Sequence, residues 1–250
     1  MRIIVIGGTG LIGSKVVANL ADHGDEAVAA SLNTGVNTYT GEGLDAVLQD
    51  ADVVVDVSNS PSFEDAAVLD FFTTTSTNLM KAESAAGVGH HVALSIVNND
   101  LIPDSGYMRA KAAQERIIRE SGLPYSIVRA TQFFEFSTAI GAGSTVDGAV
   151  RLPAVRYQPM AAQDVAMAVS HVALGRPVNG TVDIAGPRSY SFAEFIERAL
   201  ADLGVPQPVV VDPQAPYFGS VLTESMLVPD EDARLGETTY EQWLATQTRG

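Results

Sequence analysis

The sequence predicts an α/β fold built on a doubly wound parallel sheet. Short runs of Val, Ile and Ala alternate with segments of helical periodicity along the first 130 residues. Strands that alternate with helices form right-handed βαβ units and hence a parallel sheet. The strand runs are continuously apolar, as expected when helices cover both faces of the sheet.

The first half accounts for most of the expected sheet. Strands are expected at residues 2–6, 26–30, 53–57, 90–95 and 125–129. Helices are expected at residues 11–23, 44–48, 63–86 and 107–121. In the first helix the apolar residues recur on one face. The threonines at 73–75 disfavour the third helix locally, because β-branched side chains lose rotamer freedom there.

The alternation becomes irregular after about residue 130. Gly141, Gly143 and Gly148 suggest a loose loop, and several prolines mark irregular chain farther on. Helices are expected at residues 164–174, 192–203 and 240–247, with a strand at 182–184. We interpret residues 1–250 as a single domain in which residues 131–250 contribute most of a small C-terminal cap, and segment 212–228 is a candidate lid.

Composition and charge exclude several classes of site. The chain has 250 residues, no Cys and a formal net charge of −15. The lack of Cys rules out disulfides, thiolate nucleophiles and Cys-ligated metals. The acidic balance argues against nucleic acid as a partner. The first apolar run ends after four residues, too short for a signal or a membrane span, so we expect a cytoplasmic protein with no membrane partner.

The strongest motif directly follows the first strand and begins the first helix. Its members are Gly7, Gly8, Thr9, Gly10, Leu11, Ile12 and Gly13. Glycines permit a tight turn and a close approach of the backbone to a pyrophosphate, which the amides of the helix N-terminus then bind. In this context the motif predicts a Rossmann dinucleotide site, the alternative being a tight turn without a ligand.

The end of the second strand bears on the choice of coenzyme. NAD-binding chains place an acid there to hold the ribose hydroxyls, and this chain has Ser31, Asn33 and Thr34 instead. The missing acid favours NADP(H) over NAD(H), although no arginine is present to hold the extra phosphate. Asn59, after the third strand, and Ala130, after the fifth, are also expected beside the coenzyme.

A tyrosine and a lysine four residues apart form the catalytic candidate. Tyr107 and Lys111 share one face of a predicted helix, and Ser95 ends the fourth strand twelve residues before Tyr107. A carbonyl that receives hydride must also gain a proton, which a phenol can donate if a neighbouring ammonium lowers its pKa. A serine hydroxyl can donate a second hydrogen bond to the carbonyl oxygen.

These residues resemble the short-chain dehydrogenase/reductase superfamily, and more narrowly its atypical branch of NmrA-like NAD(P)-binding proteins. Residues 122–130 and 158–166 also match that branch. The resemblance implies that Ser95, Tyr107 and Lys111 form the catalytic triad, with Lys111 also holding the nicotinamide ribose. The branch contains carbonyl and quinone reductases as well as regulators that bind a dinucleotide without turning it over.

The chain after the fifth strand is expected to border the nicotinamide and the substrate. The candidate substrate residues are Gln132, Phe133, Phe134, Phe136 and Met160. The phenylalanines suit an apolar pocket, and packing of the cap onto the sheet explains them equally well. His90 and His91 are expected to point to opposite faces of a strand and to hold no metal, because neighbouring strand residues alternate.

Two classes of function therefore stay open. The first is an NAD(P)H-dependent oxidoreductase that reduces a small, largely apolar ketone or aldehyde, with Tyr107 as proton donor; a quinone reductase is a variant of it. The second is an NADP(H)-binding redox sensor without turnover. A sugar epimerase is a weaker third hypothesis. The expected partner is the small carbonyl substrate, and a homo-oligomer stays open.

Overall fold

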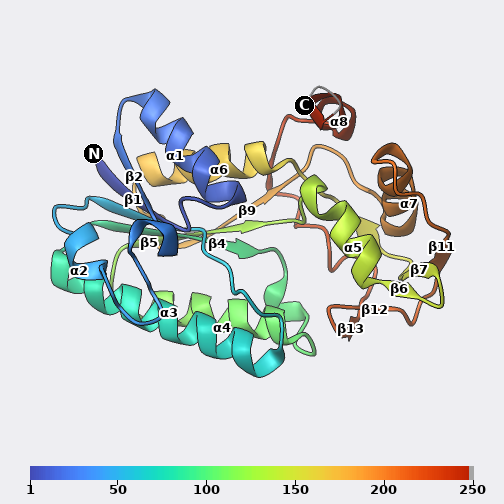
Figure 1. Cartoon of the computed structure of the whole chain (residues 1–250), viewed down its shortest axis with the longest axis horizontal. Coiled ribbons are helices and arrows are strands. Elements are labelled where there is room, and N and C mark those ends of the chain that lie inside the picture. The colour runs from blue at the N-terminus through green and yellow to red at the C-terminus, as the bar shows by residue number, and fades with distance from the viewer. Residues whose placement is uncertain (248–250) are drawn as a thin grey trace.

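The computed structural model describes residues 1–247, and its centre is a seven-stranded sheet (Figure 1). All neighbouring strands in it are parallel, in the order β2-β1-β3-β4-β5-β9-β14. The strands are β1 (Arg2–Ile6), β2 (Glu26–Ala30), β3 (Val53–Asp56), β4 (His90–Ile96), β5 (Tyr125–Ala130), β9 (Gly180–Ala185) and β14 (Arg234–Leu235). The predicted fold class is confirmed.

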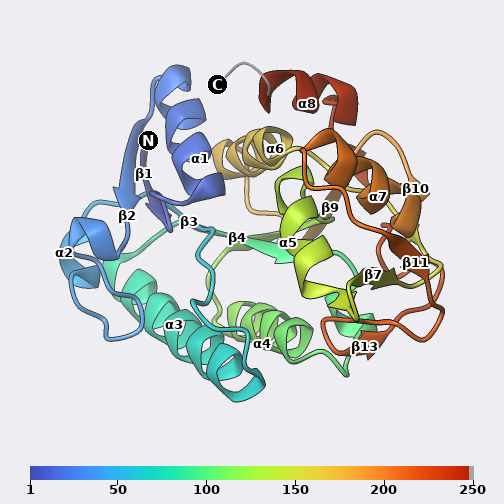
Figure 2. The same cartoon turned by 45° about the vertical axis from the view of Figure 1, so that its right-hand side comes forward.

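Helices cover both faces of the sheet, as the apolar strand runs predicted (Figures 1 and 2). The helices α1 (Leu11–His23) and α6 (Ala162–Leu174) pack on one face, and α3 (Asp65–Ala86) and α4 (Gly106–Glu120) on the other, beside the short α2 (Leu44–Val47). In β1, Ile3 faces the first layer and Ile4 faces the second, because side chains alternate along a strand. The threonine run stays helical inside α3.

The strand order creates a crevice at the carboxyl edge of the sheet. The chain leaves β1 for β2 on one side and then crosses back to β3 on the other side of β1. The loops that follow these strands therefore diverge, and open α/β sheets bind their ligands at this switch point.

The second half of the chain completes the sheet and also builds the cap. Helix α6 and strands β9 and β14 belong to the sheet layers. The cap contains α5 (Ser137–Gly143), β6 (Thr145–Val146), β7 (Ala149–Leu152), β8 (Arg156–Tyr157), β10 (Tyr190–Ser191), α7 (Phe192–Asp202), β11 (Val209–Val211), β12 (Pro216–Tyr217), β13 (Ser220–Val221) and α8 (Tyr240–Gln247). Figure 2 shows the cap beside the sheet, with α5 and α7 next to each other.

The expectation of a loose loop around Gly141 to Gly148 is wrong. Gly141 and Gly143 lie in α5, where a side chain on Gly141 would come within 3.0 Å of the Leu200 side chain of α7. Asp147 and Gly148 both have positive φ angles, 51° and 79°, and connect β6 to β7 in a tight hairpin. The glycines thus serve close helix packing and a turn. Within residues 1–247, no helix has the length and apolar composition needed to span a bilayer.

One ion pair is buried in the layer behind the sheet. The Nδ1 atom of His91 lies 2.9 Å from Oε1 of Glu83, and the two side chains are 1% and 0% exposed. The neighbouring His90 bonds Ser126 of β5 at 2.8 Å, so the two histidines have separate partners. Burial alone lowers the pKa of His91, but the Glu83 carboxylate outweighs burial and the pKa is raised.

We expect Glu83→Gln to destabilise the fold by about 3 kcal/mol at pH 6, because it leaves one partner of a buried pair without its counter-charge. A histidine whose pKa is raised on folding contributes its full stabilisation of the fold at pH values below its unfolded pKa of about 6.5. This stabilisation is lost as the pH rises through the pKa of the folded state. The difference between wild type and variant should therefore shrink by pH 9. Urea unfolding at both pH values measures it.

The matched control is Glu120→Gln, which removes an exposed carboxylate 3.9 Å from Arg116. Exposed pairs contribute about 1 kcal/mol or less, so this variant should unfold nearly as the wild type does. A Glu83→Gln protein as stable as the control at pH 6 would contradict the assigned role of the buried pair.

Candidate functional site

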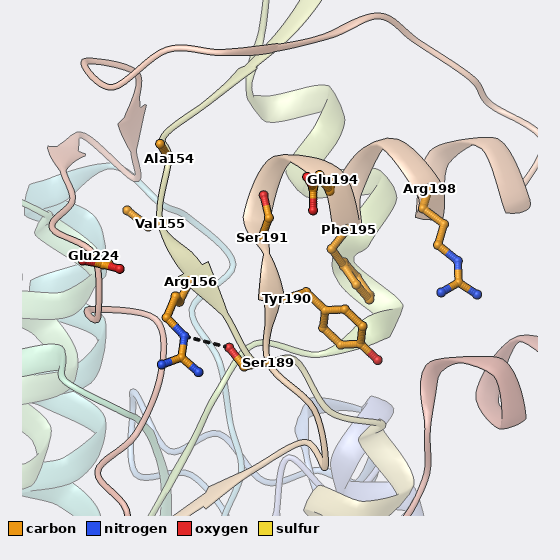
Figure 3. A pocket seen from close by; sticks show the side chains of 10 residues that line it. All are labelled: Ala154, Val155, Arg156, Ser189, Tyr190, Ser191, Glu194, Phe195, Arg198 and Glu224. Atoms are coloured by element: carbon orange, nitrogen blue, oxygen red, sulfur yellow. Dashed lines mark hydrogen bonds between the residues drawn. The ribbon is translucent and has the colours of Figure 1, made fainter.

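Two hollows on the described part of the chain differ in their fit to the predicted motifs, which line one and are missing from the other. The cleft at the carboxyl ends of β1, β3 and β4 has a volume of about 590 Å³ and is bordered by Gly7, Gly10, Asn59, Tyr107 and Lys111. A larger hollow of about 730 Å³ lies in the cap between β8, β10 and α7 (Figure 3). It shares no lining residue with the cleft and contains none of the predicted site residues.

The arginines of the larger hollow already have partners on the protein. Arg156 donates a hydrogen bond to Ser189 at 3.2 Å, drawn in Figure 3, and Arg198 pairs with Glu241 at 2.9 Å. The cleft also lies at the switch point of the sheet, where ligands bind in this architecture. We therefore take the smaller cleft as the functional site.

The glycines between β1 and α1 have separate physical roles. Gly7 has a φ of +77° and borders the cleft. Gly8 does not border it: a Cβ there would lie 2.7 Å from the Val5 carbonyl oxygen. A Cβ on Gly13 would collide with the Gly7 carbonyl. Gly8 and Gly13 therefore let strand and helix approach closely, which leaves Gly7 and Gly10 at the cleft.

The N-terminus of α1 opens onto the same cleft. Its N-cap is Gly10, no side chain caps it, and its first turn contains no acidic residue. Thr9, Leu11 and Ile12 also border the cleft. Unpaired amides and the positive end of a helix dipole suit a pyrophosphate, so this turn fits the dinucleotide that the motif predicted.

The region beyond β2 is polar but uncharged. Ser31, Leu32 and Asn33 border the cleft there. Thr34 does not: its hydroxyl donates to the Ser31 carbonyl at 3.0 Å and accepts from the Ser31 amide at 2.8 Å. Among the described residues that line the cleft, Lys111 is the only charged one.

Tyr107 lies in the first turn of α4 with its hydroxyl toward the loop after β3. The hydroxyl donates a hydrogen bond to Oδ1 of Asn59 at 2.9 Å. Burial raises the pKa of Tyr107 to about 12, and the hydrogen bond with Asn59 opposes part of that rise. The phenol is therefore protonated at neutral pH.

Lys111 is 3% exposed and is held by partners other than Tyr107. Its ammonium donates to the Leu94 carbonyl at 2.9 Å and to Oε1 of Gln114, and it lies 4.4 Å from the centre of the Phe72 ring. Burial lowers the pKa of Lys111 to about 8, against the attraction of Asp56 and Glu115.

The expected lowering of the Tyr107 pKa by Lys111 is not observed. Gln114 donates its amide to Oδ2 of Asp56 at 2.9 Å, so Lys111 belongs to a chain of polar groups that leads away from the phenol. Spacing along a helix placed both side chains on one face. The spacing could not show that Leu94 and Gln114 bind the Lys111 ammonium more closely than Tyr107 does.

Ser95 borders the cleft, but its hydroxyl proton is used inside the protein. It donates to Oε1 of Glu115 at 2.6 Å and accepts from Asn99 at 3.0 Å. Arg129 binds the same carboxylate with two donors, at 2.9 and 2.7 Å. The expected role of Ser95 as donor to a carbonyl would require breaking its bond to Glu115. A buried carboxylate attracts every nearby donor, and the sequence did not reveal its position.

The predicted substrate residues divide between the cleft and the core. Phe133 and Phe136 line the cleft, with ring centres 5.4 Å apart and planes 25° apart. Phe134 packs instead in the cap core against Phe195 and Trp243. The other two predicted substrate residues, Gln132 and Met160, are absent from the lining of the cleft, as is Ala130, which was expected beside the coenzyme. Phe133 is the N-cap of the short 3₁₀ helix Phe134–Phe136, and residues three apart share one side of such a helix, so Phe133 and Phe136 face the cleft while Phe134 faces the core.

Two exposed aromatic residues beside Tyr107 were missed by sequence reasoning, in addition to the buried Phe72. The ring of Phe63, before α3, lies 5.4 Å from that of Tyr107. Phe218 lies at 5.9 Å and 26° from it, at the tip of the β12–β13 hairpin. This tip belongs to segment 212–228, the candidate lid. The Pro216 and Gly219 turn signals could have indicated the hairpin, but nothing local indicates its contact with Tyr107.

Comparison with known families gives a match over residues 7–173, to the family described as NAD(P)H-binding. Among curated proteins, the photosystem II assembly factor Ycf39 of Synechocystis is 26% identical over 79% of this chain and 66% of its own length. A (4-alkanoyl-5-oxo-2,5-dihydrofuran-3-yl)methyl phosphate reductase of Streptomyces griseus is 29% identical over 60% of this chain and 54% of its own length. The chain thus matches less than two thirds of each of these relatives.

Solved structures share the fold at low identity. MoeE5 in complex with UDP-glucuronic acid and NAD aligns over 100% of this chain and 98% of its own, with a TM-score of 0.75 and 18% identity. The NADPH-dependent quinone oxidoreductase QOR2 of Escherichia coli aligns over 99% and 100%, with a TM-score of 0.68 and 14% identity. At these identities the likeness concerns the fold alone.

We expect Gly10→Val to weaken NADPH binding by roughly tenfold or more, about 1.4 kcal/mol, because a branched side chain would fill space that the pyrophosphate needs. A Cβ at this position meets only the Gly7 carbonyl oxygen, at a tight 3.3 Å, so the turn must shift slightly, and a melting curve verifies that the variant is folded. Calorimetric titration with NADPH measures the effect.

The control is Gly143→Val in α5, where a Cβ would meet no atom within 4 Å. Gly143→Val should leave the dissociation constant for NADPH unchanged. Unaltered binding by a folded Gly10→Val protein would place the dinucleotide elsewhere.

Proposed function

Since the chain belongs to the NAD(P)H-binding family, in the atypical short-chain dehydrogenase/reductase branch that its motifs predicted, we propose that it is an NAD(P)H-dependent oxidoreductase that reduces a small, largely apolar ketone or aldehyde. The observation that carries the proposal is the protonated Tyr107 hydroxyl in the same cleft as the glycine turn. The glycine turn would hold the pyrophosphate of the coenzyme, and Tyr107 would donate a proton beside the nicotinamide.

A bound reduced nicotinamide supplies hydride to the carbonyl carbon. The residues of the chain supply the rest: the Tyr107 hydroxyl gives its proton to the carbonyl oxygen as negative charge develops there. Asn59 accepts a hydrogen bond from this hydroxyl and so fixes its position before reaction; the hydroxyl then turns its proton from Asn59 to the substrate oxygen, a neutral amide being a weaker acceptor than the carboxylate that holds the Ser95 proton. Phe133 and Phe136 give the cleft an apolar wall, which suits a substrate with few polar groups.

Two alternatives have support of their own. A dinucleotide sensor without turnover is supported by the bond that ties Ser95 to Glu115, and the Ycf39 relative carries the name of an assembly factor rather than of an enzyme. A quinone reductase is supported by the aromatic walls of the cleft, because a quinone accepts hydride with less need for an acid of the enzyme. Removal of the Tyr107 hydroxyl separates these hypotheses, because only ketone and aldehyde reduction requires its proton.

We expect Tyr107→Phe to lower turnover of ketones and aldehydes by about 10² or more, the effect of losing a general acid. The measurement is NADPH consumption with a panel of ketones, aldehydes and quinones. The control is Tyr125→Phe, which changes a tyrosine at the start of β5, at the amino edge of the sheet. It should retain full activity.

The panel also decides among the alternatives. If Tyr107→Phe still reduces quinones but no longer reduces ketones, quinone reduction is an activity of the protein that does not need the Tyr107 proton. NADPH binding with no turnover of any panel member by the wild type would overturn the enzyme proposal in favour of the sensor.

The same proposal includes NADP(H) as the preferred coenzyme. It is supported by the lack of an acidic side chain among the described residues lining the cleft beyond β2, because an acid there would repel the 2′-phosphate. Ser31 and Asn33 offer uncharged hydrogen-bonding groups instead. Leu32 is 72% exposed and leaves room beside them.

We expect the wild type to bind NADPH more tightly than NADH. Ser31→Asp should reverse this order, and Leu32→Arg should strengthen NADPH binding by about tenfold, as a charge-assisted bond to phosphate would. Dissociation constants for both coenzymes measure these changes. Tighter binding of NADH by the wild type would contradict the assignment.

A further inference from the structure

Exposed phenylalanines gather around the cleft. Phe63 is 56% exposed, and Phe136 and Phe218 are each 44% exposed. They come from three separate segments: the chain before α3, the turn before α5, and the β12–β13 hairpin. Phe136 lines the cleft; Phe63 and Phe218 are not among its lining residues but lie at its rim, where their rings contact that of the lining residue Tyr107. Apolar side chains exposed together at a cleft mark a binding surface.

Phe218 occupies a backbone conformation that disfavours a bulky side chain. Its φ is +47°, and that of Gly219 is +84°, so the pair forms the two-residue turn of the hairpin. Glycine or asparagine suits such a turn far better than phenylalanine. Strained residues of this kind concentrate at functional sites, where the surrounding structure holds them.

Hydrogen bonds hold both ends of segment 212–228, and they position the tip of the β12–β13 hairpin within it. On one side, the amide of Asp212 donates to the Leu152 carbonyl at 2.9 Å. On the other, Asn98 donates to the Val228 carbonyl at 2.8 Å. Between these anchors, the Phe218 ring packs on Phe63 at 6.0 Å and on Tyr107. The segment thus brings an aromatic face to the proton donor.

We infer that Phe218 determines substrate specificity by stacking on a planar ring conjugated to the reacting carbonyl, as in an aryl ketone, an aromatic aldehyde or a quinone. This inference rests on the proposed function and narrows its substrate class. A carbonyl oxygen within hydrogen-bond reach of the Tyr107 hydroxyl brings the rest of a small substrate beside the Tyr107 ring. The neighbouring faces of Phe218 and Phe63 then favour a flat ring, because aromatic pairs stack face to face with an offset.

The test compares two methyl ketones with the same carbon skeleton, acetophenone, whose ring is flat, aromatic and conjugated to the carbonyl, and cyclohexyl methyl ketone, whose ring is saturated and puckered. The wild type should have the lower KM for acetophenone. Phe218→Leu should raise the KM for acetophenone by about fivefold to tenfold, the magnitude of a lost aromatic pair, with little change in kcat. The KM for cyclohexyl methyl ketone should stay nearly constant, and Phe218→Tyr should restore the preference.

The control on the same hairpin is Val221→Ala, whose side chain is 53% exposed and outside the ring cluster. It should leave both KM values unchanged. Phe218→Asn is the second variant, because asparagine tolerates a positive φ and should preserve the turn. Melting temperatures verify that each variant is folded.

Binding of both ketones to the NADP⁺-loaded protein, measured by calorimetry, separates this inference from the proposed function. A binding preference for acetophenone that depends on Phe218, together with no turnover of any member of the carbonyl panel, would overturn the proposed reduction and support the stacking role. Equal binding of both ketones by the wild type, or equal losses for both in Phe218→Leu, would overturn the inference even if the protein is an active reductase.

Discussion

The close approach of β1 and α1 at the glycine turn is the constraint on which the site depends. Gly8 packs against the Val5 carbonyl and Gly13 against the Gly7 carbonyl, with no space for a side chain at either position. This contact directs the uncapped end of α1 at the cleft. A larger residue at either glycine would push the helix away and remove the amides from the position where a pyrophosphate can reach them.

The opposite wall depends on how α4 is attached to the end of β3. Tyr107 bonds Asn59 in the loop after that strand, and Gln114 bonds Asp56 at its end. These two contacts fix one face of α4 over the cleft. Burial of this face shifts both groups away from their charged forms: it raises the pKa of the Tyr107 phenol, which is protonated at neutral pH in any case, and it makes the Lys111 ammonium a stronger acid.

Glu115 shows how the core competes with the cleft for polar groups. Ser95, Asn99 and Arg129 all donate to its carboxylate, which lowers the pKa of Glu115 despite burial. This network stiffens the junction of β4, β5 and α4 behind the site. The aromatic rings on the other side come from the cap and from the chain before α3, so rigid polar contacts hold the acid while apolar groups shape the space in front of it.

Local patterns determined the parallel sheet, the helices around it and the glycine turn, because strand runs, helical periodicity and glycine geometry act over short stretches of chain. Tyr107 and Asn59 could be placed at the cleft for the same reason. Partner choice was decided only by the tertiary structure: Lys111 bonds Gln114, Ser95 bonds Glu115, and Phe218 meets Tyr107 across more than 100 residues. Such contacts depend on packing between distant segments, which carries no local signal in the sequence.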